Sequence, residues 1–224
     1  MQDSFYLTFY LTFKLALITT FILLIIGVPV AYYLAYTRAR LKPVLETIVS
    51  MPLVLPPSVL GFYLLVTFGA ESFLGGFIIQ TFGVRLVFSF EGLVLGSVIF
   101  SLPFMVQPIQ AGFEKIPESL HEAALTLGKS KFRTLFMVLL PNTKPSLITG
   151  VVLAFAHTIG EFGVVLMIGG NIPGVTRVAS IAIYDEIEAL NYGLANQYAL
   201  SLFAITFLIL LLVYIINRRF IKGS

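Results

Sequence analysis

The chain has no cysteine, no tryptophan and only two histidines in 224 residues. Without cysteine, disulfides and thiolate metal sites are excluded. Without tryptophan, an aromatic belt at a membrane surface has to be built from the 10 tyrosines and 21 phenylalanines. Charged residues make up 11% of the chain, whereas a soluble domain carries about 25%. This shortage of charge, together with 58% hydrophobic residues, predicts an integral membrane protein.

Catalytic patterns are also missing. The sequence has no HExxH pair and no group of carboxylates with the spacing of a metal site. We therefore expect no catalytic residue, no metal, no bound cofactor, no enzymatic activity of the chain's own and no nucleic-acid partner. The first ten residues hold one acid and no base, unlike a signal peptide, so we expect the first apolar run to be retained as a membrane span.

The apolar residues fall into five stretches of about the 20 residues that a membrane span requires. The fold class predicted is an all-α integral membrane protein, a polytopic bundle of five transmembrane helices forming a single domain over 1–224. A short surface helix is expected over 73–82. A sixth helix dipping into the membrane, within 73–83 or 178–190, is the alternative. The expected spans are 15–36, 45–68, 92–111, 146–168 and 198–216.

Two of these spans contain residues that affect helix geometry. The second contains the adjacent prolines Pro56 and Pro57, which remove backbone donors in mid-helix. Such a break is tolerated in lipid only against protein or a water-filled cavity. It is therefore either a kink packed on a neighbour or backbone that faces a permeation path. In the third span, Gly92 and Gly96 form a GxxxG pair, which permits close contact between helices.

The basic residues predict the orientation in the membrane. Of the 14 lysines and arginines, 11 fall on one side of the five-span arrangement: three in 37–43, five in 113–145 and three after residue 216. Basic residues accumulate in cytoplasmic loops. We therefore expect the N-terminus outside, and the segment 113–145 and the C-terminus in the cytoplasm.

The longest polar interruption, 118–141, is expected to be cytoplasmic. Its residues 123–130 match a relaxed phosphate-loop pattern, but the first glycine is replaced by Ala123 and helix formers follow it, so nucleotide binding is disfavoured. Ser119 and Glu122 fit a capping box for a short helix that Gly128 ends or bends. A second amphipathic piece should run from Lys129 to Leu140 and stop at Pro141. This element is either a helix on the membrane surface or a docking site for another protein.

The same segment resembles the EAA loop of the permeases of ABC importers, EAA-x3-G-x9-I-x-LP. Val138 stands where the family usually has isoleucine. The resemblance implies a type I ABC importer permease fold with a cytoplasmic coupling helix, about 118–140, that inserts into the ATPase subunit. The residues that it assigns to this coupling are Glu122, Ala123, Ala124, Gly128, Leu140 and Pro141.

Two further segments, 51–62 and 154–177, resemble the molybdate permease, with GEFG at 160–163 and NIPG at 171–174. The resemblance covers about 45–180. It implies a homodimer in the cytoplasmic (inner) membrane, surrounded by lipid, with an ABC ATPase dimer and an extracytoplasmic oxyanion-binding protein as partners and molybdate in transit. Tungstate and sulfate permeases share much of the pattern and remain alternatives, as does a membrane scaffold without a pathway.

Glu161 is an ionisable residue inside a predicted span, which marks it as a functional candidate. A bare carboxylate repels an oxyanion, so we favour a structural role in which Glu161 is protonated or hydrogen-bonded, with His157 or backbone donors as partners. The candidates for the pathway or for helix packing are Pro56, Pro57, His157, Gly160, Glu161 and Gly163.

Two other charged groups receive structural interpretations. Glu46 is expected to form a weak surface pair with Lys42. Asp185, Glu186 and Glu188 are expected to form a solvated acidic face outside the membrane, with a basic rim on the binding protein as the weaker alternative.

Overall fold

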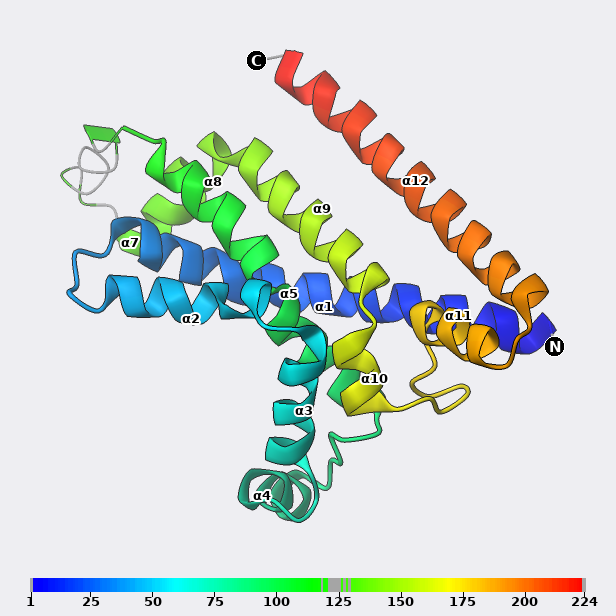
Figure 1. Ribbon diagram of the computed structural model, residues 1–224. Coiled ribbons are helices and arrows are strands. Elements are labelled where there is room, and N and C mark those ends of the chain that lie inside the picture. The colour runs from blue at the N-terminus through cyan, green and yellow to red at the C-terminus, as the bar shows by residue number, and fades with distance from the viewer. Residues whose placement is uncertain (1, 118, 121–125, 127, 129, 223–224) are drawn as a thin grey trace.

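The computed structural model describes the chain except residues 1, 118, 121–125, 127, 129 and 223–224 (Figure 1). All regular elements among the described residues are helical, which confirms the predicted fold class. The helices are α1 (Gln2–Tyr36), α2 (Lys42–Val54), α3 (Pro57–Phe68), α4 (Phe73–Phe82), α5 (Phe90–Glu114), α7 (Lys131–Thr134), η1 (Leu135–Leu139), α8 (Leu140–Asn142), α9 (Lys144–Gly160), α10 (Gly163–Gly169), α11 (Ala179–Glu188) and α12 (Tyr192–Lys222).

Among the described residues, three helices are long and apolar enough to cross a membrane: α1, α5 and α12. Two further spans result if each strongly bent pair counts as one. The first pair is α2 with α3, bent by 110°, and the second is η1–α8 with α9, bent by 79°. Within the described residues this gives up to five spans, the number predicted. The first span begins near Ser4, well before the predicted start at Leu15.

α5 forms the centre of the bundle and packs against α1 and α9, which also contact each other. Its residues Met105, Ile109 and Phe113 recur at helical spacing and are fully buried, in one cluster with Leu23, Leu34 and Ala154. α5 and α9 approach each other closely, because a β-carbon on Gly112 would lie 2.5 Å from the side chain of Ser146. Small residues thus allow tight packing at the centre of the bundle.

The predicted surface helix over 73–82 is confirmed with the same ends, as α4. Ser72 caps it by accepting a hydrogen bond from the N–H of Gly75 at 2.9 Å. Gly83 follows with a φ of +68°, the left-handed conformation that ends many helices. The second candidate region for a sixth helix, 178–190, contains α11. Both α4 and α11 have 10 residues, too few to cross a membrane.

The fourth span was predicted as one helix over 146–168, and this was wrong. α9 ends at Gly160, Glu161 takes an extended conformation (φ −67°, ψ 134°), and α10 begins at Gly163. The glycines that flank Glu161 and Phe162 favour the helix less than other residues by about 1 kcal/mol each. The described part of the chain therefore has a helix break at Glu161 in addition to the bends at Pro56 and at Thr143.

α12 begins beside the N-terminus of α1 and then runs away from the bundle (Figure 1). Tyr198 packs against Phe5 and Phe9 there, with ring centroids 4.7 and 6.1 Å apart. Only 6% of the apolar window of α12 is buried. Most of this helix is thus available to contacts outside the chain.

Candidate functional site

The predicted coupling segment lies only in part within the described residues. Glu122, Ala123 and Ala124 lie outside them, as does most of the expected first helix. Gly128 is described and has a φ of +74°, and a β-carbon added to it would meet nothing within 4 Å. A left-handed glycine at this point agrees with the prediction that it ends or bends the helix.

The second piece of the segment is helical, but it does not stop at Pro141 as predicted. α7 continues into the π-helical turn η1, and α8 carries the helix through Pro141 to Asn142. A proline ring in a helix clashes with the carbonyl four residues earlier. The wider π-helical turn η1, which ends two residues before Pro141, relieves this clash. The periodicity of the sequence does not predict a π-turn. The helix ends at Thr143, whose hydroxyl donates to the carbonyl of Leu139 at 3.1 Å.

Leu135 and Leu139 anchor this segment to the bundle, and the sequence prediction missed both. They are 5% and 0% exposed and pack in the same cluster as Phe113 of α5. Leu140, which was predicted, is half-buried against the same cluster. These two buried leucines therefore join the segment to the same apolar cluster as α5.

The predicted pathway residues come together around one hollow of about 590 Å³. Five of the six line it, from segments about 100 residues apart in the chain; Pro56 is the exception and caps the N-terminus of α3. A β-carbon on Gly163 would lie 2.7 Å from Cβ of Pro57, so the two helix breaks touch. The lining residues are Pro57, Ser58, Phe100, Ala156, His157, Gly160, Glu161, Phe162 and Gly163.

His157 is fixed by α5. Its Nδ1 lies 2.9 Å from the hydroxyl of Ser101, which also lies 3.1 Å from the hydroxyl of Thr158. The imidazole stacks on Phe104, with centroids 3.9 Å apart, and packs on Phe100 at 4.8 Å. The partner of His157 is therefore Ser101, and His157, one of the two kinds of partner expected for Glu161, does not bind it.

Glu161 is 4% exposed, and neither carboxyl oxygen has a hydrogen-bond partner within the described part of the chain. Ser97 of α5 faces the carboxyl, but without the geometry of a hydrogen bond. The main chain of Glu161 is held by α11, because the hydroxyl of Ser180 donates to its carbonyl. A buried polar group without a hydrogen-bond partner destabilises a fold by about 1–3 kcal/mol. Packing alone therefore does not explain why a carboxyl is present at position 161.

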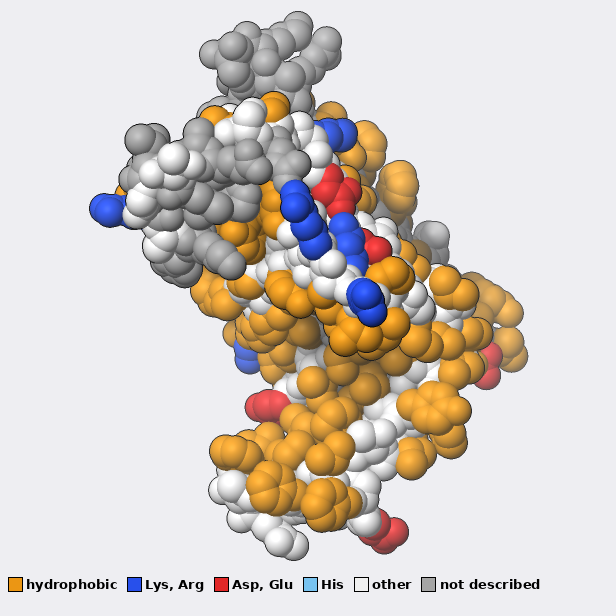
Figure 2. All heavy atoms as spheres, turned by 90° about the vertical axis from the view of Figure 1, so that its left-hand side faces the viewer, with side chains coloured by type: hydrophobic (Ala, Val, Ile, Leu, Met, Phe, Trp, Pro, Cys, Tyr) orange, Lys and Arg blue, Asp and Glu red, His pale blue; other side chains and the backbone are white. Residues whose placement is uncertain are grey.

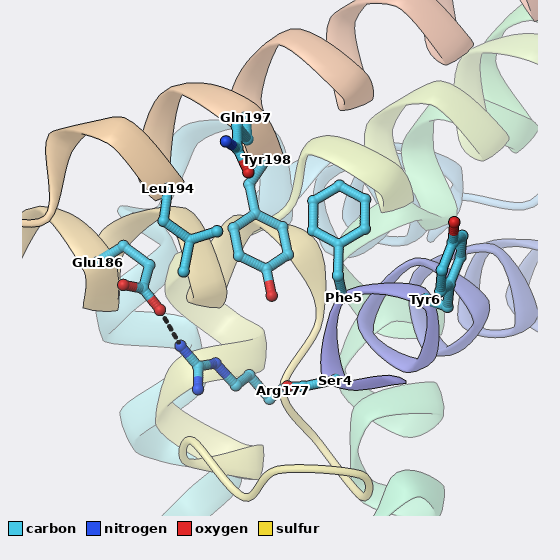
Figure 3. Close-up of a pocket in the computed structure, with 8 residues that line it drawn as sticks. All are labelled: Ser4, Phe5, Tyr6, Arg177, Glu186, Leu194, Gln197 and Tyr198. Atoms are coloured by element: carbon cyan, nitrogen blue, oxygen red, sulfur yellow. Dashed lines mark hydrogen bonds and ion pairs between the residues drawn. The ribbon is translucent and has the colours of Figure 1, made fainter. Parts of the chain in front are cut away.

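Asp185 and Glu186 of α11 are ion-paired and not freely solvated, contrary to the prediction, whereas Glu188 is exposed as predicted. The guanidinium of Arg177 lies 2.7 Å from the carboxylate of Asp185 and 3.1 Å from that of Glu186. Figure 3 shows Arg177 directed toward Glu186, beside Phe5 of α1 and Tyr198 of α12. These residues line a hollow of about 440 Å³ that joins the starts of α1 and α12 to α11.

The opposite end of the bundle is basic. Figure 2 views the end at which the α1–α2 loop and α7 lie, and Lys and Arg side chains gather there. The predicted pair of Lys42 with Glu46 is confirmed at 3.7 Å, and Lys42 is also 3.7 Å from Glu114 of α5. Within the described residues no group of three His, Cys, Asp or Glu side chains is placed to hold a metal.

Comparison with known proteins identifies the family. The model of the family "Binding-protein-dependent transport system inner membrane component" matches residues 24–222. The chain belongs to this family. The permease is 49% identical over 202 residues to the molybdenum transport system permease protein ModB of Azotobacter vinelandii, covering 90% of the chain and 88% of that relative. It is 42% identical over 147 residues to ModB of Escherichia coli K12, covering 66% of the chain and 64% of the relative.

More distant relatives are named as permeases for other substrates. The sulfate transport system permease protein CysT of Salmonella typhimurium is 31% identical over 196 residues, covering 88% of the permease and 70% of CysT. Among solved structures, the MetNI methionine ABC transporter matches with a TM-score of 0.71 at 20% identity, over 94% of the permease and 93% of that chain. A bacterial alginate importer matches with a TM-score of 0.81 at 15% identity, over 98% and 80%. These ABC transporter chains and the permease share one fold, that of the permease subunit of an ABC importer.

Proposed function

We propose that the chain is the permease subunit of an ATP-driven importer that moves molybdate across the cytoplasmic membrane into the cell. The observation that carries this proposal is the 49% identity, over 90% of the chain, to a relative named as a molybdenum permease. The sulfate relative is 31% identical, so sulfate is the weaker candidate. Tungstate, which has the same tetrahedral geometry as molybdate, remains the competitor to test.

The coupling partner proposed is a separate ABC ATPase dimer at the basic end of the bundle. The segment 118–140 would dock on it, with Glu122, Ala123, Ala124 and Gly128 at the interface and Leu140 and Pro141 at the return to α9. The permease itself would hydrolyse no ATP and bind no cofactor. The apolar cluster that contains Leu135, Leu139 and Phe113 supports this assignment, because it includes residues of both the segment that follows the docking residues and the central helix.

Two copies would form the pathway about a twofold axis. α12 and the outward side of α3 support a homodimer in lipid: the apolar window of α12 is only 6% buried, and Phe62, Tyr63 and Val66 are each at least half exposed. An oxyanion-binding protein would deliver the substrate at the opposite end of the bundle, near α11. The N-terminus would then lie outside and the C-terminus in the cytoplasm, as the distribution of bases predicts.

Reconstitution tests this function. The permease is inserted into proteoliposomes with the ATPase and the binding protein, and uptake of labelled molybdate is followed with and without ATP. Competition with unlabelled tungstate and sulfate ranks the three anions. A complex that assembles but takes up none of them would support the alternative of a membrane scaffold and contradict the transport function.

A further inference from the structure

Uncharged polar side chains gather where α2 meets α5, although both helices belong to membrane spans. α5 is buried along most of its length, yet Gln107 on it is exposed. The amide nitrogen of Gln107 donates to the hydroxyl of Ser50 on α2, at 3.1 Å. Thr47, one turn before Ser50, is exposed as well. Thr47, Ser50 and Gln107 are called the polar seam below.

The polar seam lies deep in the membrane. α2 begins with Lys42 at the basic end of the bundle, and Ser50 follows eight residues later in the helix. At 1.5 Å per residue, Ser50 lies about 12 Å from that end, within a hydrocarbon core of about 30 Å. Gln107 is at the same depth, because it bonds to Ser50. An exposed amide at this depth is unfavourable in lipid, so we expect water or protein against it.

The seam keeps hydrogen-bond donors that the described part of the chain does not use. A glutamine amide has two N–H donors, and Gln107 uses one of them on Ser50. Ser50 accepts that bond, which leaves its own O–H to donate. Thr47 differs, because its hydroxyl donates to the carbonyl of Pro43 at 2.8 Å. One amide N–H and one hydroxyl are thus available to water or a ligand.

A hollow of about 570 Å³ runs along the same face of α2. Its lining includes Glu46, Ser50 and Val54, which are four residues apart and therefore share one face of the helix. A lipid-facing surface is apolar, as on α12, where Phe203 and Phe207 are each more than half exposed. The polar lining of the α2 hollow instead fits a cavity that holds water.

The one acid that lines this hollow, Glu46, is paired. The ammonium of Lys42 lies 3.7 Å from the carboxylate of Glu46 and 3.7 Å from that of Glu114. The amide nitrogen of Gln110 donates to the same two carboxylates, at 2.8 and 3.0 Å. A cation and an amide donor thus offset the charge of Glu46. An anion in the hollow would meet the neutral donors of the seam one turn deeper.

We propose that the polar seam lines the inner half of the translocation pathway, where Gln107 and Ser50 donate hydrogen bonds to a tetrahedral oxyanion on its way to the cytoplasm. The inference rests on the proposed function and deepens it, because it names side chains that the anion passes. Water and the passing anion, and not lipid or a second copy, then cover this face. Neutral donors suit such a place, because an anion in transit has to be released again.

Cysteine accessibility tests the seam without any transport, because the chain has no cysteine of its own. Ser50→Cys and Gln107→Cys are assembled with the ATPase in inverted membrane vesicles and treated with a charged, water-soluble thiol reagent. A thiol reacts as the thiolate, which an apolar environment disfavours. Both positions should be labelled about tenfold faster than Phe203→Cys, the control on α12, where Phe203 is 69% exposed.

The other two possible neighbours of the seam give different results. If lipid covers it, position 107 reacts as slowly as position 203. If a second copy packs on it, Gln107→Cys is protected from the reagent and forms a disulfide-linked dimer on oxidation. Either result overturns the proposal.

Contact with the anion is tested by uptake of labelled molybdate per ATP hydrolysed. Gln107→Glu is nearly isosteric and adds a negative charge, so it should lower this ratio about tenfold or more. Gln107→Leu removes the donors and should lower it about threefold. Gln80→Glu, the same change at an exposed position of α4, is the matched control and should stay within about twofold.

An unchanged ratio in the Gln107→Glu variant would overturn the proposal, even if position 107 is reached by water. Failure of the unmodified permease to transport any oxyanion would instead contradict the proposed function, which the labelling does not test.

Discussion

Gly163, at the start of α10, lies so close to Pro57, at the start of α3, that a β-carbon on the glycine would be 2.7 Å from Cβ of the proline. The same β-carbon would be 3.3 Å from the backbone nitrogen of Ser58. Neither neighbour is the end of a flexible side chain. The contact therefore fixes the distance between the two helix breaks.

Gly163→Ala is expected to destabilise the permease by about 1–3 kcal/mol, because backbone has to shift to admit the methyl group. Uptake should fall with it, since the walls of the hollow move apart. Gly160→Ala is the matched control for stability, because a β-carbon on Gly160 meets nothing within 4 Å. Thermal unfolding and uptake of both variants check this. Equal behaviour of the two would contradict the close contact.

Leu139 provides the connection between the coupling segment and α5. Its side chain is 0% exposed, so Leu139→Ala should cost about 2–5 kcal/mol and leave a cavity in the apolar cluster that also contains Phe113. ATP hydrolysis in the assembled complex should then exceed transport, because movement of the segment no longer reaches the bundle. Met137→Ala, in the same turn but 56% exposed, should change neither stability nor the transport per ATP by more than about twofold. A Leu139 variant with the normal ratio would show that the coupling takes another route.

Gly128→Leu is expected to leave the permease inserted but to uncouple or dissociate the ATPase. Two causes are possible, and a second variant distinguishes them. Gly128 has a φ of +74°, which asparagine tolerates and leucine does not. If only the backbone conformation matters, the ATPase stays bound to the Gly128→Asn variant. The coupling assignment instead requires close approach of the ATPase to Gly128, and in that case both variants release it. Co-purification of the ATPase measures this, and normal transport by the Leu variant would contradict the assignment.

The absence of cysteine makes the orientation directly measurable. Arg40→Cys places a thiol in the α1–α2 loop, and Glu188→Cys places one at the exposed end of α11. A membrane-impermeant thiol reagent added to intact cells should label position 188 and spare position 40 until the membrane is opened. The reverse pattern would invert the topology.

The spans and α4 were predictable from the sequence because their signals are local. Ser72 and Gly83 bound α4 at the expected places, and long apolar runs define α1, α5 and α12. The break at Glu161 was missed because hydropathy continues through it; what stabilises the break is contact with α3 and α11, which are distant in the chain.

The candidate site was also predictable only in part. Pro57, His157, Glu161 and Gly163 were named from the sequence, and the structure places them around one hollow. Their partners were not predictable: Ser101 for His157, and Arg177 for Asp185 and Glu186, are tertiary contacts between separate elements. Leu135 and Leu139 were missed because apolar residues at helical spacing also fit a helix lying on the membrane surface.

Accumulation of labelled molybdate against its concentration gradient tests the central claim most directly. Proteoliposomes contain the permease with its ATPase, and the binding protein is outside with ATP enclosed. We expect the internal concentration to exceed the external one, and the excess to vanish without ATP and with Gly128→Leu. Equal concentrations on both sides, or an excess that the Gly128 variant retains, would contradict the account of a permease driven through its cytoplasmic segment.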